Sequence, residues 1–152
     1  MESAECILDT GFIHLEPHSI GSGKGKKFGV KRSIRDSVSR FVPPDDLEAA
    51  RAELLNELVN VQVWFHLFPN PPSGTNTRIK KDLDNLVKPV LDVLQPWMDA
   101  GSTEKGLGII DSDSRICELH SWKELCERPE DEGIRIRIFK HDDDKMRAVL
   151  ME

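Results

Sequence analysis

The stretch VNVQVWFHLF at positions 59–68 alternates apolar and polar residues and then becomes continuously apolar. Such a run, rich in Val and aromatic residues, predicts a β-strand, and its apolar second half is typical of a strand in the interior of a sheet. A loop rich in Pro, Gly and Asn follows at positions 69–77. The rest of the fold is predicted from the segments on either side of this strand.

Three segments have the spacing of amphipathic helices. The first is predicted from Lys31, with Ile34, Val38 and Phe41 on one face. The second starts at Pro43-Pro44-Asp45-Asp46 and carries one apolar stripe: Leu47, Ala50, Leu54, Leu55 and Leu58. The third covers residues 83–94, and we expect it to start near Asn85 because Pro89 is best tolerated in a first turn.

Further strands are predicted at 6–15, interrupted at Gly11, and at 115–123. Strict alternation at 134–139 predicts an edge or half-buried strand, and residues 142–152 a short helix. The order of elements indicates an α+β fold, a small mixed sheet flanked by helices, in one domain over residues 1–152 with a basic loop at about 17–32.

The composition narrows the function classes. The chain has 152 residues, 38% hydrophobic and 32% charged, and no run approaches the roughly 18 apolar residues of a membrane span. Its first residues are acidic, unlike a secretion signal. Cys6, Cys117 and Cys126 are too scattered for a disulfide framework or a zinc site. We therefore expect a cytoplasmic protein without a membrane partner.

The charge is unevenly distributed. The net charge is −6, but positions 24–40 hold seven basic residues and one acid, so this segment is +6 and the remainder −12. A local positive field attracts a polyanion even when the whole chain is acidic. A solvated basic loop without a partner is the alternative. The candidate phosphate contacts are Lys24, Lys26, Lys27, Lys31, Arg32 and Arg35.

Aspartates cluster near the start of the third helix and in a later turn. Asp82 and Asp84 precede Lys88, and Asp111 and Asp113 follow two isoleucines. Paired carboxylates suit Mg²⁺, and a lysine one helical turn on can meet an anionic group. The alternative is that the first pair caps a helix and the second forms a turn.

Other site types are excluded by spacing. An EF-hand from Asp111 would need Gly and Glu where Ile116 and Trp122 stand. A sugar-nucleotide site at Asp82 and Asp84 lacks an accompanying GxGxxG motif. The sequence also lacks HExxH, GxSxG and GxxxxGK[ST] motifs, which sets aside zinc hydrolases, serine hydrolases and P-loop enzymes.

The segment DLDNLVKPVLDVL at 82–94 resembles the DxDNxxKxxxDxL signature of RusA-type Holliday junction resolvases. Residues 110–116, with Lys123 downstream, are similar to the acidic DDSQV segment of that family. The chain departs from the family in having Ser112 before Asp113, a longer loop at 95–108 and an acidic net charge.

This resemblance implies a homodimeric, Mg²⁺-dependent endonuclease, with Mn²⁺ as a substitute, that nicks paired strands of four-way DNA junctions in recombination and repair. It implies a cytoplasmic protein of bacterial or phage type. Asp82, Asp84 and Asp113 become metal ligands, and Lys88 joins them as a catalytic residue. Residues expected around these ligands are Asp111, Asn85 and Lys123.

The resemblance implies metal-assisted phosphodiester hydrolysis, in which the ion lowers the pKa of a bound water. Two other functions stay open. The first is a catalytically weak nucleic-acid-binding protein that keeps the fold. The second is a metal-dependent enzyme for a small phosphorylated substrate, which would not need the basic segment.

Overall fold

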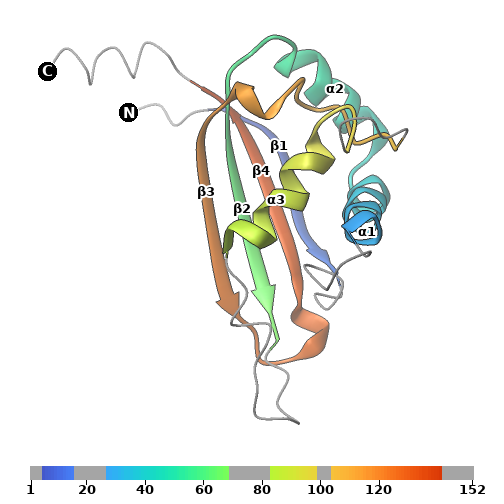
Figure 1. Ribbon diagram of the computed structural model, residues 1–152, viewed down its shortest axis with the longest axis vertical. Helices are drawn as coiled ribbons and strands as arrows, with labels where there is room; N and C mark the ends of the chain where they lie inside the picture. The colour runs from blue at the N-terminus through green and yellow to red at the C-terminus, as the bar shows by residue number, and fades with distance from the viewer. Residues whose placement is uncertain (1–4, 16–26, 69–82, 99–103, 142–152) are drawn as a thin grey trace, which may run out of the picture.

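A computed structural model describes residues 5–15, 27–68, 83–98 and 104–141. Three helices, four strands and two short 3-10 turns are present in these ranges (Figure 1). In chain order they are β1 (Cys6–His14), α1 (Lys27–Phe41), α2 (Pro44–Leu54), β2 (Val59–Leu67), α3 (Leu83–Leu94), η3 (Asp113–Arg115), β3 (Ile116–Leu125), η4 (Pro129–Asp131) and β4 (Gly133–Lys140). None of the described helices is long and apolar enough to cross a membrane.

The four strands form one mixed sheet in the order β1-β4-β2-β3, which confirms the predicted α+β class. β4 pairs antiparallel with β1 and with β2, whereas β2 and β3 are parallel. A parallel pair needs a long crossover, usually a helix. α3 lies in that crossover and packs on the sheet, where it runs in front of β2 and β4 (Figure 1).

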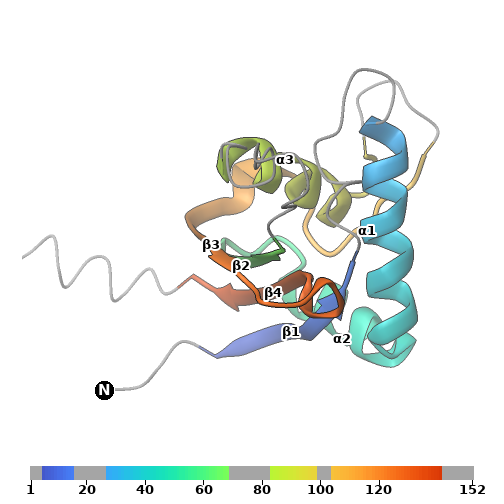
Figure 2. The ribbon, with the colours of Figure 1, turned by 90° about the horizontal axis from the view of Figure 1, so that it is seen from below.

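One face of the sheet carries the core. β2 alternates strictly along its length, with Val59, Val61, Val63, Phe65 and Leu67 all buried. Alternate residues of β4 are buried on the same face, and side chains from all three helices join that core. In the end-on view of Figure 2, α1 and α3 lie together on one side of the sheet. No described helix covers its other face.

The sequence predicted an edge or half-buried strand at 134–139; β4 is half-buried, with one face in the core, but it is not an edge. β4 lies between β1 and β2, and β3 is an edge instead. Its alternation of isoleucines with Arg135 and Arg137 is real, but this pattern reports one buried face of a strand. The alternating pattern does not show whether the strand has one neighbouring strand or two.

Helix boundaries also differ from the sequence prediction. α1 begins at Lys27 rather than Lys31, so the basic loop expected to reach position 32 ends before the helix. At its other end Phe41 is 54% exposed and the adjacent Val42 is buried in its place. α2 ends at Leu54, and the backbone then becomes extended at Leu55, which turns that side chain into solvent. The helix expected at 142–152 lies outside the described residues.

α3 begins at Leu83 rather than near Asn85, and it keeps Pro89 in its interior. Proline has no N–H group, so the carbonyl four residues earlier, that of Asn85, loses its helical donor. Asn85 is exposed, where water can satisfy that carbonyl. Burial of five side chains on the opposite face of α3 offsets the loss.

β1 is bent where the sequence predicted an interruption. Gly11 has a φ of +66°, a conformation that favours glycine, and the pairing of β1 with β4 shifts between Asp9 and Phe12. The Asp9 carboxylate accepts hydrogen bonds from the Gly11 N–H at 2.9 Å and from the Arg135 guanidinium at 3.0 and 2.6 Å. These bonds join the bulge to β4.

The hydrogen bond from Arg135 is the main cause that holds the pKa of Asp9 below its ordinary value of 3.8, although partial burial opposes it. A carboxyl group whose pKa is lower in the folded state stabilises the fold above its unfolded pKa and loses that effect as pH falls through the folded value. We predict that Asp9→Asn lowers the free energy of unfolding by less than about 1 kcal/mol at pH 7. The difference should begin to shrink as the pH falls to about 3.8, the ordinary pKa of the group, and should vanish only below its lower folded pKa.

Urea unfolding of both proteins across this pH range measures the effect. The exposed Glu118 on edge strand β3 gives a matched control, Glu118→Gln. A difference between wild type and Asp9→Asn that grows on acidification would contradict the assignment.

Candidate functional site

The outer surface of α3 carries the motif residues. Its core face buries Leu86, Val87, Val90, Val93 and Leu94. On the exposed side lie Asp84, in the first turn, and Asn85 and Lys88. Asp84 and Lys88 are four residues apart and therefore neighbours on one face of the helix. The predicted proximity of one motif carboxylate and the motif lysine is thus present.

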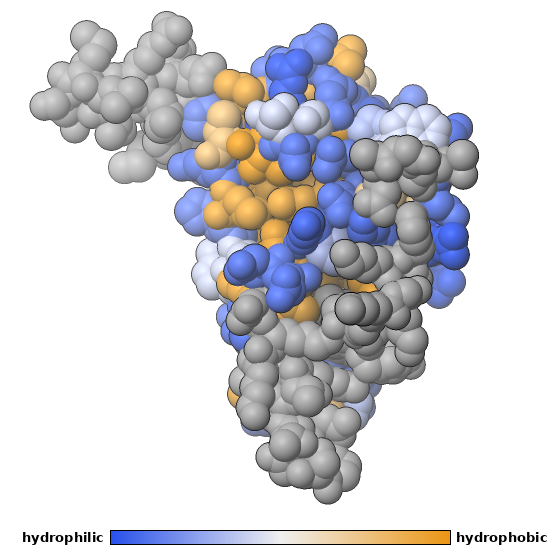
Figure 3. All heavy atoms as spheres, viewed as in Figure 1, coloured by the Kyte–Doolittle hydropathy of each residue, from blue (hydrophilic) through white to orange (hydrophobic). Residues whose placement is uncertain are grey.

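A groove of about 360 Å³ runs between α3 and β3 beside these two residues. Apolar side chains form most of its lining, with Ser121 as the polar group from β3. Figure 3 shows apolar atoms among polar ones over this part of the molecule. The groove is lined by Leu83, Asp84, Val87, Lys88, Leu91, Leu119 and Ser121.

The register of β3 places a further predicted residue near this groove. Ser121 pairs with Val63 and Lys123 with Phe65, both of which are buried under the helices. Residues two apart on a strand share a face, so Lys123 lies on the same side of the sheet as α3. Lys123 therefore lies on the helix-covered side of the sheet, as do the groove residues Asp84, Lys88 and Ser121. The groove partners Ser121 and Leu119 were not predicted, because only the pairing with β2 shows which face of β3 meets the helix.

The acidic turn lies elsewhere. The backbone N–H groups of Ile109 and Ile110 donate to the carbonyl of Leu94, the last residue of α3, at 2.8 and 3.1 Å. The turn that follows therefore begins at the C-terminal end of the helix, whereas Asp84 is in its first turn. Ten residues separate Asp84 from Leu94, or about 15 Å at 1.5 Å per residue.

The prediction that Asp111 and Asp113 come beside Asp84 is corrected by this arrangement. Figure 1 shows the turn at the start of β3 and the start of α3 farther along that strand. Both aspartates are exposed. Ser112 caps the short turn by accepting a hydrogen bond from the backbone N–H of Ser114 at 3.2 Å. Within the described chain this segment is a capped surface turn, as the alternative interpretation held.

In the described chain, no group of three His, Cys, Asp or Glu side chains lies close enough together to hold a metal ion. Asp82, the other half of the motif pair, lies outside the described residues. The structure therefore describes one of the three predicted carboxylates at the groove.

The predicted phosphate contact Lys31 is buried instead. Its side chain is 5% exposed, its ammonium group lies 2.9 Å from the Asp92 carboxylate of α3, and it donates to the Met98 carbonyl at 3.0 Å. Lys31 therefore joins α1 to α3 in place of contacting solvent or a ligand. The sequence prediction missed this because its partners are far away along the chain.

Arg32 and Arg35 both bind Glu104. Arg32 donates to this carboxylate at 2.6 and 3.0 Å and Arg35 at 3.2 Å. These bonds, that from Arg32 foremost, lower the pKa of Glu104, so the carboxylate stays ionised and partly neutralises both arginines. Lys24 and Lys26 lie outside the described residues, and of Lys27 only the helical backbone is described.

Comparison with known proteins adds no family. No protein-family model matches the chain, and no curated protein matches its sequence. The functional assignment therefore depends on the groove and its residues.

We predict that Asp92→Ala lowers the free energy of unfolding by about 3 kcal/mol, because it leaves the Lys31 ammonium buried without its carboxylate. Adding Lys31→Met should recover most of that loss, since it removes the buried charge. Thermal or urea unfolding measures both effects. Glu48→Ala removes an exposed partner of Arg51 and serves as the control, with an expected change below about 0.5 kcal/mol.

The opposite result would be a Lys31→Met variant with unchanged stability and a flatter salt dependence of DNA binding. It would contradict the ion pair with Asp92 and support the sequence prediction that Lys31 contacts phosphate.

Proposed function

We propose that this protein is a Mg²⁺-dependent endonuclease of the RusA type, which acts on branched DNA and resolves four-way junctions by paired nicks. The observation that carries the proposal is the placement of Asp84 and Lys88 side by side at the start of α3, on the rim of the groove against β3. A carboxylate that can bind a metal ion and a cation that can meet phosphate are the two charges that phosphodiester hydrolysis requires.

The donors at the groove suit Mg²⁺. The Asp84 carboxylate and the Ser121 hydroxyl offer hard oxygen ligands, and the sequence places the Asp82 carboxylate two residues before Asp84. Mg²⁺ usually keeps several waters and binds one or two protein carboxylates together with substrate phosphate. When bound, the ion supplies an activated water and neutralises charge on the scissile phosphate.

The residues of the chain have separate roles in this proposal. Asp84, with Asp82, would hold the ion. The Lys88 ammonium group stabilises the negative charge that develops on the phosphate during attack. Lys123, on the same side of the sheet, adds a second positive charge that helps to bind the DNA backbone.

A homodimer suits the substrate. Paired nicks in a two-fold symmetric junction need two sites related by a two-fold axis. A cytoplasmic protein of bacterial or phage type that works on DNA is part of the same proposal. Because Arg32 and Arg35 share Glu104, the DNA contacts within α1 would be weaker than the sequence suggests, and Lys24, Lys26 and Lys27 would carry more of that contact.

A second function is favoured by one specific observation. The acidic turn with Asp113 lies at the far end of α3 from Asp84, which leaves the predicted three-carboxylate set unassembled in the described chain. A nucleic-acid-binding protein that keeps the fold but cuts weakly would have this geometry. Binding of a four-way junction that is never cut in Mg²⁺ or Mn²⁺ would select this function.

We predict that Asp84→Asn lowers single-turnover cleavage of a synthetic four-way junction by at least about 100-fold, because the variant loses a charged metal ligand. Junction binding measured in EDTA should persist. Asp113→Asn, at the other end of α3, should lower cleavage by less than about tenfold, which is below the roughly 10–100-fold cost of changing a residue that orients a metal ligand.

Asp111→Asn is the matched control for Asp113→Asn, since both carboxylates are exposed in the same turn. Normal cutting by Asp84→Asn would end the proposal. An inactive Asp113→Asn alongside an active Asp111→Asn would show that the turn reaches the metal site in the assembled enzyme.

A further inference from the structure

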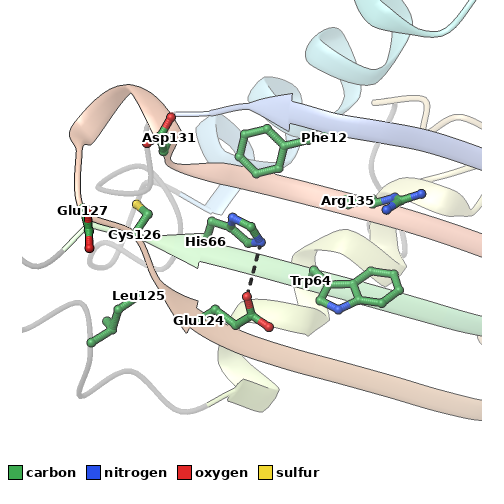
Figure 4. A pocket seen from close by; sticks show the side chains of 9 residues that line it. All are labelled: Phe12, Trp64, His66, Glu124, Leu125, Cys126, Glu127, Asp131 and Arg135. Atoms are coloured by element: carbon green, nitrogen blue, oxygen red, sulfur yellow. Dashed lines mark ion pairs between the residues drawn. The ribbon is translucent and has the colours of Figure 1, made fainter.

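The uncovered face of the sheet has its own hollow, on the opposite side from the groove at α3. About 650 Å³ in volume, it lies over the ends of the strands near η4 (Figure 4). Its rings come from β1 and β2, on either side of β4, and its carboxylates come from β3, the β3–η4 connection and η4. Its lining is Phe12, Trp64, His66, Glu124, Leu125, Cys126, Glu127, Asp131 and Arg135.

Strand register brings the rings together. Phe12 is opposite Arg135, Arg135 opposite Trp64, and Trp64 opposite Trp122, so the four form one row across the sheet. The Trp64 and Trp122 rings stack with centroids 4.6 Å apart, and Phe12 lies 4.9 Å from the ring of His66. Phe12 is 45% and Trp122 37% exposed, a large aromatic surface for a sheet face.

A glycine makes room for this arrangement. A Cβ atom at Gly133 would lie 2.8 Å from the ring of Phe12 and 2.1 Å from the Ile13 carbonyl. The absence of a side chain there lets β1 approach β4 and lets the Phe12 ring lie over the backbone. The wall of the hollow therefore depends on backbone geometry as well as on the rings.

The charges around the hollow are predominantly negative. Counted with the groups that form ion pairs with its lining, four carboxylates and two guanidinium groups surround the hollow, a net −2 when His66 is counted as neutral. The carboxylates are Asp9, Glu124, Glu127 and Asp131, and the guanidinium groups are Arg128 and Arg135. A phosphate-bearing ligand would be repelled here, and a cation attracted.

The chain itself shows that a guanidinium fits against these rings. Cζ of Arg135 lies 5.7 Å from the centroid of a Trp64 ring while the Asp9 carboxylate binds its nitrogens. Aromatic faces combined with carboxylates are the environment that organic cations prefer, because the ring quadrupole and the anionic oxygens attract the same charge.

We propose that this hollow binds the guanidinium or ammonium side chain of a basic protein partner. The cation lies against the Phe12 and His66 rings, with Glu124 and Glu127 accepting its hydrogen bonds. The inference is independent of the nuclease proposal, since the hollow and the groove at Asp84 lie on opposite faces of the sheet.

The test uses the full chain and a capped peptide in which arginine alternates with glycine. A second peptide carries citrulline at each arginine position, which keeps the shape and removes the charge. Isothermal titration calorimetry at low salt should show binding of the arginine peptide, with the citrulline peptide at least about tenfold weaker. Added salt should weaken the arginine peptide most.

Two variants locate the site. Glu124→Gln and Phe12→Leu should each weaken the arginine peptide by about two- to fivefold, which corresponds to one exposed charge pair or cation–π contact. The matched controls are Glu48→Gln and Phe41→Leu, exposed residues of α2 and α1 that should bind as wild type does. Circular dichroism checks the fold of each variant.

A third readout needs no variant. In NMR spectra of wild type, the indole N–H signals of Trp64 and Trp122 should shift on peptide addition, and that of the exposed Trp97 should not. Equal binding of the citrulline peptide, no detectable binding of the arginine peptide, or displacement of that peptide by guanosine monophosphate would each overturn the proposal. The last result would assign the hollow to a nucleotide instead.

Discussion

Burial of one face of β2 is the constraint on which the rest of the structure depends. Five of its side chains point into the core, and each is worth about 1.5–3 kcal/mol when fully buried. Exposed ion pairs such as Arg51 with Glu48 contribute less than about 1 kcal/mol, so they cannot position the elements. A strand buried on one face needs helices over it, and its parallel partner β3 needs a crossover on that same side. α3 meets both requirements, and this is why the motif residues on α3 face outward beside β3.

Local periodicity predicted the elements of this fold well, and the α+β class with them. Pairing between distant segments was beyond it, because the alternating isoleucines of β4 look the same at an edge or in the middle of a sheet. Pro89 led to a late start for α3, since a local rule assigns a cost to proline without weighing the five side chains that the helix buries. Leu55 was predicted on the apolar stripe of the second helix, but the helix ends at Leu54 and the Leu55 side chain is exposed. The spacing of apolar residues does not show where the backbone leaves the helix.

The candidate site likewise has a part that local spacing predicted and a part that depends on the tertiary structure. Asp84 and Lys88 were predicted as neighbours because helical spacing alone brings them together. The position of Asp113 depends on the direction in which α3 crosses the sheet, a property of the tertiary structure, and the sequence prediction for it was wrong. The sequence assigned Lys31 to a basic segment. Its partner Asp92 lies on another helix, so local sequence could not predict the ion pair. The resemblance to a nuclease family stays a prediction. The groove beside Asp84 and Lys88 supports it, and the position of the acidic turn at the other end of α3 does not.

The order β1-β4-β2-β3 has a consequence for the synthesis of the chain. β4, the last strand of the described chain, inserts between the first and the second, and it pairs Ile134 with Ile13 across more than a hundred residues. A nascent chain that has reached β3 still exposes the edges of β1 and β2, both apolar on one face, and such edges invite pairing with other chains. Folding of this sheet must therefore wait until β4 has left the ribosome, and a ribosome that stalls before Gly133 would release a chain prone to aggregation rather than a smaller working domain.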